Sequence, residues 1–268
     1  MLRTYWAFLR RDAAIWVSYP WARFLDVLSI FFSCATFYFL SQLLGSTALP
    51  ALESYGGNYF AFVLIGIAFS NFQGVGLNSI ARSLRTEQQI GTLETTLSTP
   101  VTLPRFVVGS ILWDFLYATI ETFLYFGIGI LVFGFSMKES HLLSAMLVLM
   151  ASVFAFSSLG VLSAAFILRF KRGDPIAWFL GTVSELLGGV FFPLIILPAW
   201  LQEISWFIPM AHALEGLRLS LLQGAGIGQV FHHFLWLLIF SAVLLPFSFL
   251  LLHWAFRQSQ KEGSLGHY

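Results

Sequence analysis

The sequence predicts an all-α polytopic membrane protein with six transmembrane helices, an N-terminal amphipathic interfacial helix, and short re-entrant outer-leaflet helices between spans five and six. Of the 268 residues, 58% are apolar and only 10% are charged, whereas a soluble domain carries about 25% charged residues. The apolar residues form continuous runs of roughly 20 residues, the length of a spanning helix. Lysine and arginine gather in alternate connecting segments, which is typical of a polytopic membrane protein.

The apolar runs predict helices rather than strands, because membrane strands alternate apolar and polar residues. We expect all the spans to belong to one transmembrane domain over residues 1–268. The six expected spans cover residues 24–44, 59–81, 106–135, 142–170, 175–197 and 234–256.

The cationic residues predict the direction of the chain. With the N-terminus inside, twelve of the 14 Lys and Arg residues lie on the cytoplasmic side, and Lys138 and Arg218 lie outside. The twelve are Arg3, Arg10, Arg11, Arg23, Arg82, Arg85, Arg105, Arg169, Lys171, Arg172, Arg257 and Lys261. The excess of positive charge inside therefore places both termini in the cytoplasm.

Residues 1–20 are expected to form an amphipathic helix in the cytoplasmic interface, with a break at Pro20. Apolar residues at a 4-3-4-3 spacing share one face, while Arg10 and Arg11 lie away from it and are suited to anionic headgroups. The apolar face comprises Leu2, Trp6, Leu9, Ala13 and Trp16, with the tryptophans toward lipid. The alternative is an ordinary basic flank that anchors the first span.

The most polar inner connection is the segment 82–104 between spans two and three. Ile90, Leu93 and Leu97 keep a helical stripe. Glu87 and Glu94 are seven residues apart, so a helix brings them close together on its surface. These features predict a short helix at the membrane surface that docks a cytosolic partner; the alternative is a solvated connecting loop.

The chain after span five is interrupted by proline. Pro193, Pro198 and Pro209 break the region, and Trp200 and Trp206 are residue types of the membrane interface. We expect residues 198–223 to form short helices in the outer leaflet, where irregular backbone must be covered by protein or line a cavity.

Four carboxylates fall within or near the apolar runs. Asp26 and Asp114 lie near enough to a boundary to reach water, whereas Glu121 and Glu185 lie more centrally. Asp114 and Glu121 are seven residues apart and share a face of span three. Because a charge inside the membrane is costly, Glu121 and Glu185 are expected at a translocation route or a subunit interface.

The sequence carries no recognised motif for bond chemistry. It contains no His-Glu-x-x-His, no Cys-x-x-Cys, no Gly-x-Ser-x-Gly and no phosphate loop ending in Gly-Lys-Ser/Thr. Adjacent His232 and His233 are expected to be structural, because neighbours on a helix do not face the same way. The basic residues form no single patch, which argues against nucleic acid as a partner. We therefore expect a non-enzymatic protein without a directly bound cofactor or metal.

Two stretches resemble permeases of the ABC-2 (type V) exporter family. The inner connection, from Glu87-Gln88-Gln89-Ile90-Gly91-Thr92-Leu93-Glu94 through Leu97-Ser98-Thr99-Pro100-Val101, resembles the loop after span two in that family. The second stretch comprises Phe192-Pro193, Leu197-Pro198-Ala199-Trp200-Leu201 and Ile208-Pro209 through Arg218, with Ile208 where the family commonly has Asn. The length, the six-span plan and the preceding amphipathic helix also match.

The resemblance implies a permease that works as a pair, expected to be a homodimer, with two cytosolic ATP-binding subunits that use the ATP. The implied ATPase-coupling residues are Glu87, Gln88, Ile90, Gly91, Leu93, Glu94 and Leu97. The helix with Trp6, Arg10, Arg11 and Trp16 would be a connecting helix beside membrane lipid. Together with Glu121 and Glu185, the residues expected at a translocation route or subunit interface are Pro193, Pro198, Pro209 and Arg218.

The implied cargo is a hydrophobic or amphipathic molecule (a lipid, a polysaccharide or a drug-like compound) exported across a bacterial cytoplasmic membrane. Two other function classes stay open. A self-sufficient channel or secondary transporter would predict inverted repeats and broken helices at mid-membrane. A lipid-modifying membrane enzyme would require catalytic or metal-binding side chains clustered near one interface. Association with a cytosolic ATPase distinguishes the exporter from both.

Overall fold

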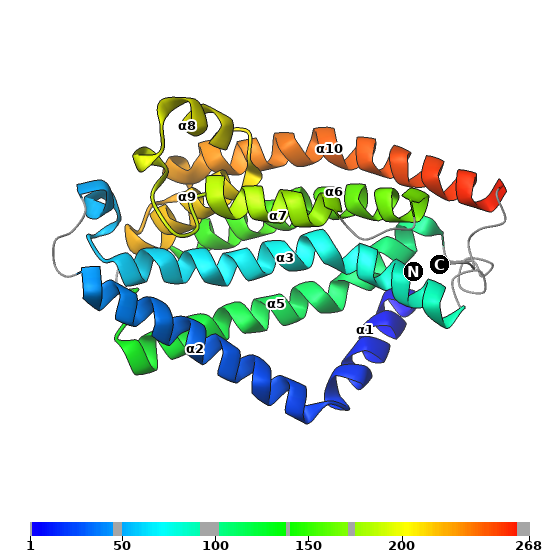
Figure 1. The fold of residues 1–268 in the computed structure, drawn as a ribbon, viewed down its shortest axis with the longest axis horizontal. Helices are drawn as coiled ribbons and strands as arrows, with labels where there is room; N and C mark the ends of the chain where they lie inside the picture. The colour runs from blue at the N-terminus through cyan, green and yellow to red at the C-terminus, as the bar shows by residue number, and fades with distance from the viewer. Residues whose placement is uncertain (1, 45–49, 92–101, 138–139, 171–174, 262–268) are drawn as a thin grey trace.

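The computed structural model describes residues 2–44, 50–91, 102–137, 140–170 and 175–261, and within these ranges it is helical without strands (Figure 1). Five helices are long and apolar enough to cross a membrane. They are α2 (Pro20–Leu44), α3 (Tyr59–Ile90), α5 (Leu103–Phe133), α6 (Leu142–Phe170) and α10 (Ile227–Lys261). The all-helical membrane fold expected from the sequence is therefore confirmed, and α6 has the same bounds as the expected fourth span.

The expected fifth span over residues 175–197 differs in the structure. Only α7 (Pro175–Leu187) is α-helical there, and a non-helical segment follows it. A helix of 13 residues is about 20 Å long, which is shorter than the roughly 30 Å hydrocarbon core. Gly189, with φ of +76°, and Pro193 explain the break, because the first adopts a left-handed backbone and the second lacks an N–H group.

Helices α3 and α6 form the centre of the bundle and are largely buried, whereas α2, α5 and α10 expose most of their apolar surface. Glycines allow α3 and α6 to approach closely. A Cβ atom at Gly160 would collide with the backbone oxygen of Gly76, and one at Gly76 would lie 2.5 Å from the Cβ of Phe156. Small residues are the usual means of close helix packing in membranes.

The two ends of the bundle differ. The beginning of α1 (Leu2–Val17) and the end of α10 lie at one end, which we call the terminal end (Figure 1). The elements η1 (Pro50–Tyr55), α8 (Ala199–Ser205) and α9 (Pro209–Leu222) gather at the opposite end, which we call the far end. Short helices broken by proline therefore do occur between α7 and α10, with Pro198 directly before α8 and Pro209 at the start of α9.

Helix α1 lies obliquely to the bundle and is separated from α2 by a break at Ser18 and Tyr19, directly before Pro20 (Figure 1). It packs mainly on the first half of α5. Residues 82–90 of the expected inner connection continue α3, and residues 92–101, with the rest of the expected surface helix, lie outside the described residues. A helix of 32 residues is about 48 Å long, so α3 extends well beyond the hydrocarbon core.

Candidate functional site: a polar face on helix α3

Helix α3 carries a polar face on an otherwise apolar helix. Its positions recur at spacings of three or four residues, so at about 100° per residue they occupy less than half of the helix circumference. While most of α3 is buried, these positions are exposed or half-buried. The polar face comprises Ser70, Asn71, Gly74, Asn78, Arg82, Arg85, Thr86 and Gln89. In a membrane such a face must contact protein, water or cargo.

Acidic side chains from two other helices meet this face at adjacent residues. The Nδ2 atom of Asn71 donates to the Oε2 atom of Glu121 on α5 at 2.6 Å. The hydroxyl of Ser70 donates to the Oε1 atom of Glu185 on α7 at 2.8 Å. The structure thus brings together the two carboxylates that sequence reasoning selected, at one level of α3, with α5 and α7 flanking that helix (Figure 1).

The other two carboxylates also meet polar groups. Asp26 on α2 accepts a hydrogen bond from the hydroxyl of Tyr117 on α5 at 2.9 Å. Asp114 on α5 interacts with Ser79 and Arg82 of α3. Asp114 and Glu121 therefore both face α3, as their seven-residue spacing predicts.

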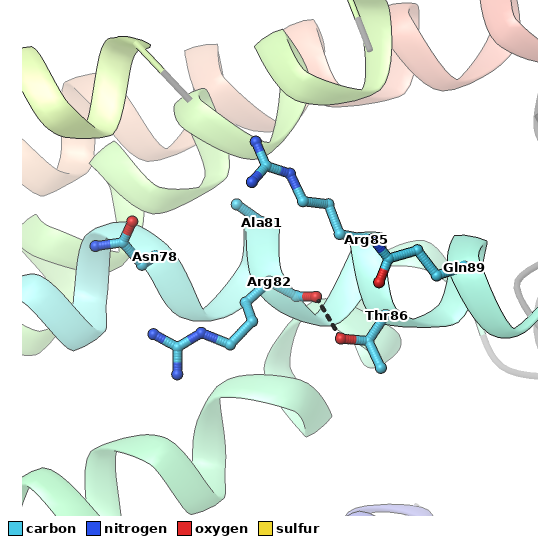
Figure 2. A pocket seen from close by; sticks show the side chains of 6 residues that line it. All are labelled: Asn78, Ala81, Arg82, Arg85, Thr86 and Gln89. Carbon is cyan, nitrogen blue, oxygen red and sulfur yellow. Dashed lines mark hydrogen bonds between the residues drawn. The ribbon is translucent and has the colours of Figure 1, made fainter. Parts of the chain in front are cut away.

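The terminal half of the polar face encloses a cavity of about 240 Å³. Figure 2 shows its lining side chains along one side of α3, with Arg82 and Arg85 leaving the helix in different directions. The hydroxyl of Thr86 donates to the carbonyl oxygen of Arg82 at 3.0 Å. The lining residues are Asn78, Ala81, Arg82, Arg85, Thr86 and Gln89.

Helix α1 docks beside the terminal end of α3. The Nη1 atom of Arg11 lies 3.0 Å from the Oε1 atom of Glu87. Phe8 is buried and packs edge-on against Phe106. A Cβ atom at Gly109 of α5 would lie 2.7 Å from the ring of Phe8. Glycine at position 109 therefore lets α1 approach α5 closely.

The predicted apolar face of α1 divides between two surroundings. The side chain of Trp6 is 68% exposed, and Arg10 is exposed as well. Trp16, which was expected to face lipid, packs edge-on against Trp113 and Tyr117 of α5. Helix α1 is therefore held by protein contacts through Phe8, Arg11 and Trp16, and it exposes Trp6.

The predicted coupling residues lie at and beyond the end of α3. Glu87 is buried and ion-paired with Arg11, whereas Ile90 is 68% exposed. Gly91 has φ of +76°, the left-handed conformation that commonly follows a helix end. The backbone of Gln88 continues α3, but its side chain and residues Leu93, Glu94 and Leu97 lie outside the described residues.

At the far end, Arg218 joins three segments. It is 2% exposed, and its guanidinium donates to the carbonyl oxygens of Phe62 on α3 and Val190, each at 3.2 Å. It also stacks 3.4 Å above the ring of Phe62. Val190 belongs to the non-helical segment after α7, whose carbonyl groups need partners away from water. Arg218 supplies such a partner from inside the protein, within the segment 198–223 that was expected in the outer leaflet.

The remaining outer prolines shape the backbone around this junction. Pro193 precedes the short helix η2 (Leu194–Ile196), and Pro198 precedes α8. Near Arg218, the hydroxyl of Tyr55 donates to Glu215 at 2.7 Å. Burial and the Glu215 carboxylate raise the pKa of Tyr55, so this hydroxyl stays protonated and able to donate.

Three histidines, His212, His232 and His233, pack together at the far end. The described part of the chain contains no group of three residues suited to a metal ion. The Nε2 atom of His212 lies 2.8 Å from the carbonyl oxygen of Trp206, so that nitrogen must carry a proton. The Nδ1 atom of neutral His212 then accepts a hydrogen bond from Nδ1 of His233 at 3.2 Å. These bonds give the cluster a structural role.

Sequence reasoning missed most of the polar face. It selected carboxylates because a charge inside the membrane is energetically unfavourable, and it did not select the neutral residues Ser70, Asn71 and Asn78. The signal was available, since polar residues at positions 71, 78, 82, 85 and 89 follow the period of a helix. The contacts of Phe8 carried no such signal, because an apolar residue suits lipid and protein equally.

Comparison with known proteins gives one family match and one relative. The sequence model of the ABC-2 type transporter family matches residues 3–222. Nodulation protein J of Rhizobium leguminosarum bv. viciae is 27% identical over 226 residues, which cover 78% of this chain and 84% of that protein. The family match includes the polar face of α3, the docked helix α1 and the Arg218 junction.

Proposed function

Because this chain belongs to the ABC-2 type transporter family, we propose that it is the membrane-spanning permease subunit of an ATP-driven exporter. A separate cytosolic subunit hydrolyses the ATP. The cargo is a hydrophobic or amphipathic molecule, such as a lipid, a polysaccharide or a drug-like compound. The family membership supports transport, and the polar face of α3 supports a route for the cargo along this helix.

The proposed route runs along the polar face. Glu121 and Glu185 contact its first residues, Asn71 and Ser70, and Arg82 and Arg85 line its terminal half. In one chain this face lacks a cover, and a second copy of the permease completes the route in our proposal. A rigid-body change between the two copies would then alter how each end of the face contacts cargo.

The proposed topology places the terminal end in the cytoplasm of a bacterial cell and the far end outside. Helix α7 and the segment after it together make the fifth of six crossings, and α8 and α9 lie in the outer leaflet. The beginning of α1 and the end of α10 lie at the same end of the bundle (Figure 1), and this arrangement, together with the positive-inside distribution of Lys and Arg, supports an even number of crossings. Hydrogen bonding by Arg218 supports an irregular segment at this depth.

The proposed coupling site is the end of α3 with residues 82–104, and α1 is the connecting helix. The ion pair between Arg11 and Glu87 supports this pairing, since it joins α1 to the end of α3. Two ATPase subunits would contact two permease copies here. Exposed Ile90 and residues beyond it are the proposed contact points.

Affinity purification of the full chain from its own cells tests the proposal. We expect a cytosolic ATP-binding protein to copurify, and its ATPase activity to depend on the permease after reconstitution into vesicles. The gene for that protein is expected beside the gene for this chain. Transport by the purified chain alone, driven by an ion gradient without ATP, would instead identify a secondary transporter.

A further inference from the structure

The cavity at the terminal half of α3 is cationic, and no described side chain around it pairs with its buried cationic donors. Its lining comes from a single helix and includes Arg82 and Arg85 (Figure 2). The Nε and Nη2 atoms of Arg85 are buried and have no hydrogen-bond partner among the described residues. Buried charged donors of this kind are costly unless a partner is supplied.

The neutral groups around the cavity do not supply that partner. The amide of Asn78 donates to the carbonyl oxygen of Gly74 at 2.8 Å, and the hydroxyl of Thr86 donates to Arg82. Asp114 on α5 acts electrostatically on Arg82. Neither Arg82 nor Arg85 forms an ion pair with another described residue, so with the single carboxylate of Asp114 nearby they contribute a surplus of positive charge.

From this geometry we infer that the cavity binds the phosphate group of an amphipathic molecule that enters from the membrane. Two guanidinium groups match a phosphate, which carries up to two charges and accepts several hydrogen bonds, better than a carboxylate with one charge. The two guanidinium groups point in different directions in Figure 2, and in our proposal rotation about their side-chain bonds brings both to one anion.

The size and position of the cavity favour a headgroup attached to an apolar tail. Pockets for whole drug-sized ligands occupy about 300–1,000 Å³, so about 240 Å³ suits a headgroup rather than a whole amphipathic molecule. The polar face continues from the cavity toward Asn71 and Ser70. The inference deepens the proposed function, because it assigns the entry point and one chemical feature of the cargo.

The test measures binding without ATP or any ATPase. The full-length chain is reconstituted in phosphatidylcholine nanodiscs and titrated with fluorescently labelled phosphatidic acid. We expect saturable binding that weakens at least tenfold in the double variant Arg82→Gln/Arg85→Gln. The double Arg→Lys variant keeps both charges and should retain binding of intermediate strength. Equal thermal unfolding temperatures of the variants show that folding is preserved.

Arg257→Gln is the matched control, because Arg257 is an exposed cation of the terminal half of α10 outside the cavity. Its binding should equal that of the unchanged chain. The inference fails if the double Gln variant binds normally, or if Arg257→Gln weakens binding as much, since general surface charge would then explain it. It also fails if labelled oleate, a carboxylate amphiphile, binds equally well, or if inorganic phosphate binds as tightly as phosphatidic acid.

The outcome is separable from the proposed function. If the chain binds phosphatidic acid through Arg82 and Arg85 yet never associates with an ATPase, the phosphate site is supported and the exporter function is rejected. If the chain exports cargo with an ATPase and its double Gln variant binds and transports normally, the exporter function is supported and the phosphate site is rejected.

Discussion

Arg11 and Glu87 lie 76 residues apart in the sequence and form an ion pair in which Nη1 and Oε1 are 3.0 Å apart. The side chain of Arg11 is 44% exposed and that of Glu87 is 11% exposed. The pair connects the helix before the first span with the end of α3. In the proposed coupling, a displacement at the end of α3 would reach α1 through this pair.

This pair predicts that reversing one charge disrupts the docking of α1. Glu87→Arg places two cations together, and we expect reduced transport and reduced permease-stimulated ATPase activity with normal membrane insertion. The double variant Arg11→Glu/Glu87→Arg restores an ion pair of opposite polarity and should recover most of the activity. Vesicle transport and ATPase assays on the single and double variants measure this.

The double variant also separates two roles of Glu87. If Glu87 acts by contacting the ATPase directly, the swapped pair will stay inactive. A double-mutant cycle on thermal unfolding should give a coupling energy of about 1 kcal/mol, as expected for a pair that is partly exposed. A coupling energy near zero would show that the pair does not hold α1.

A second prediction concerns the apolar contact of α1. Phe8 is buried against Phe106 and Gly109, so Phe8→Ala should destabilise the docked α1 by about 3 kcal/mol. Trp6→Ala is the control, because Trp6 is 68% exposed and its removal leaves no cavity. Limited proteolysis between α1 and α2 should be faster for Phe8→Ala alone. Equal cleavage of both variants would mean that α1 is held by lipid rather than by α5.

The long helices were predictable because hydropathy and charge both mark them. Helix α6 matches its expected bounds, since a continuous apolar run lies between polar residues at both ends. The fifth span was not predictable in the same way. Residues 188–197 are apolar, but Gly189 and Pro193 break the helix, and hydropathy measures side chains rather than backbone freedom.

The sequence predicts which residues of the candidate site are unfavourable in a membrane, but it does not predict which residues contact each other. The expense of charge in lipid selected Glu121 and Glu185, and the helical period places Asn71 and Asn78 on one face. Which polar group meets which carboxylate depends on how α5 and α7 pack against α3, which no local pattern encodes. The partners of Arg218 could not be predicted for the same reason, because they are two backbone carbonyls that are distant in the sequence.

A third prediction tests the Arg218 junction. Arg218→Met removes the donors to Phe62 and Val190, and we expect the free energy of unfolding to fall by about 3 kcal/mol, because the carbonyl groups lose charged hydrogen-bond partners. Arg218→Lys should lose less, since one ammonium still reaches one carbonyl. Thermal unfolding in detergent measures both. Equal stability of Arg218→Met and the unchanged chain would exclude the junction as a source of stability.

A fourth prediction uses two glycines of the same helix. A Cβ atom at Gly66 would collide with the backbone oxygen of Val190, whereas a Cβ atom at Gly74 would meet nothing within 4 Å. Gly66→Ala should therefore displace the segment after α7 and lower the unfolding temperature. Gly74→Ala should leave the unfolding temperature unchanged or raise it, because alanine is more favourable than glycine in a helix by about 1 kcal/mol. If Gly74→Ala lowers the unfolding temperature more than Gly66→Ala does, the segment after α7 does not pack on α3.

The last prediction separates charge from hydrogen bonding on the polar face. Gln at position 121 or 185 keeps an oxygen that accepts from Asn71 or Ser70, so folding should be preserved while the negative charge is lost. If the charges serve the passage of cargo, Glu121→Gln and Glu185→Gln will each reduce transport severalfold at unchanged unfolding temperature. Asn71→Ala and Ser70→Ala provide the comparison, because each leaves a carboxylate without its donor and should lower stability as well. Full transport by the Glu121→Gln/Glu185→Gln double variant would assign both carboxylates to helix packing, and the route would then lie away from this face of α3.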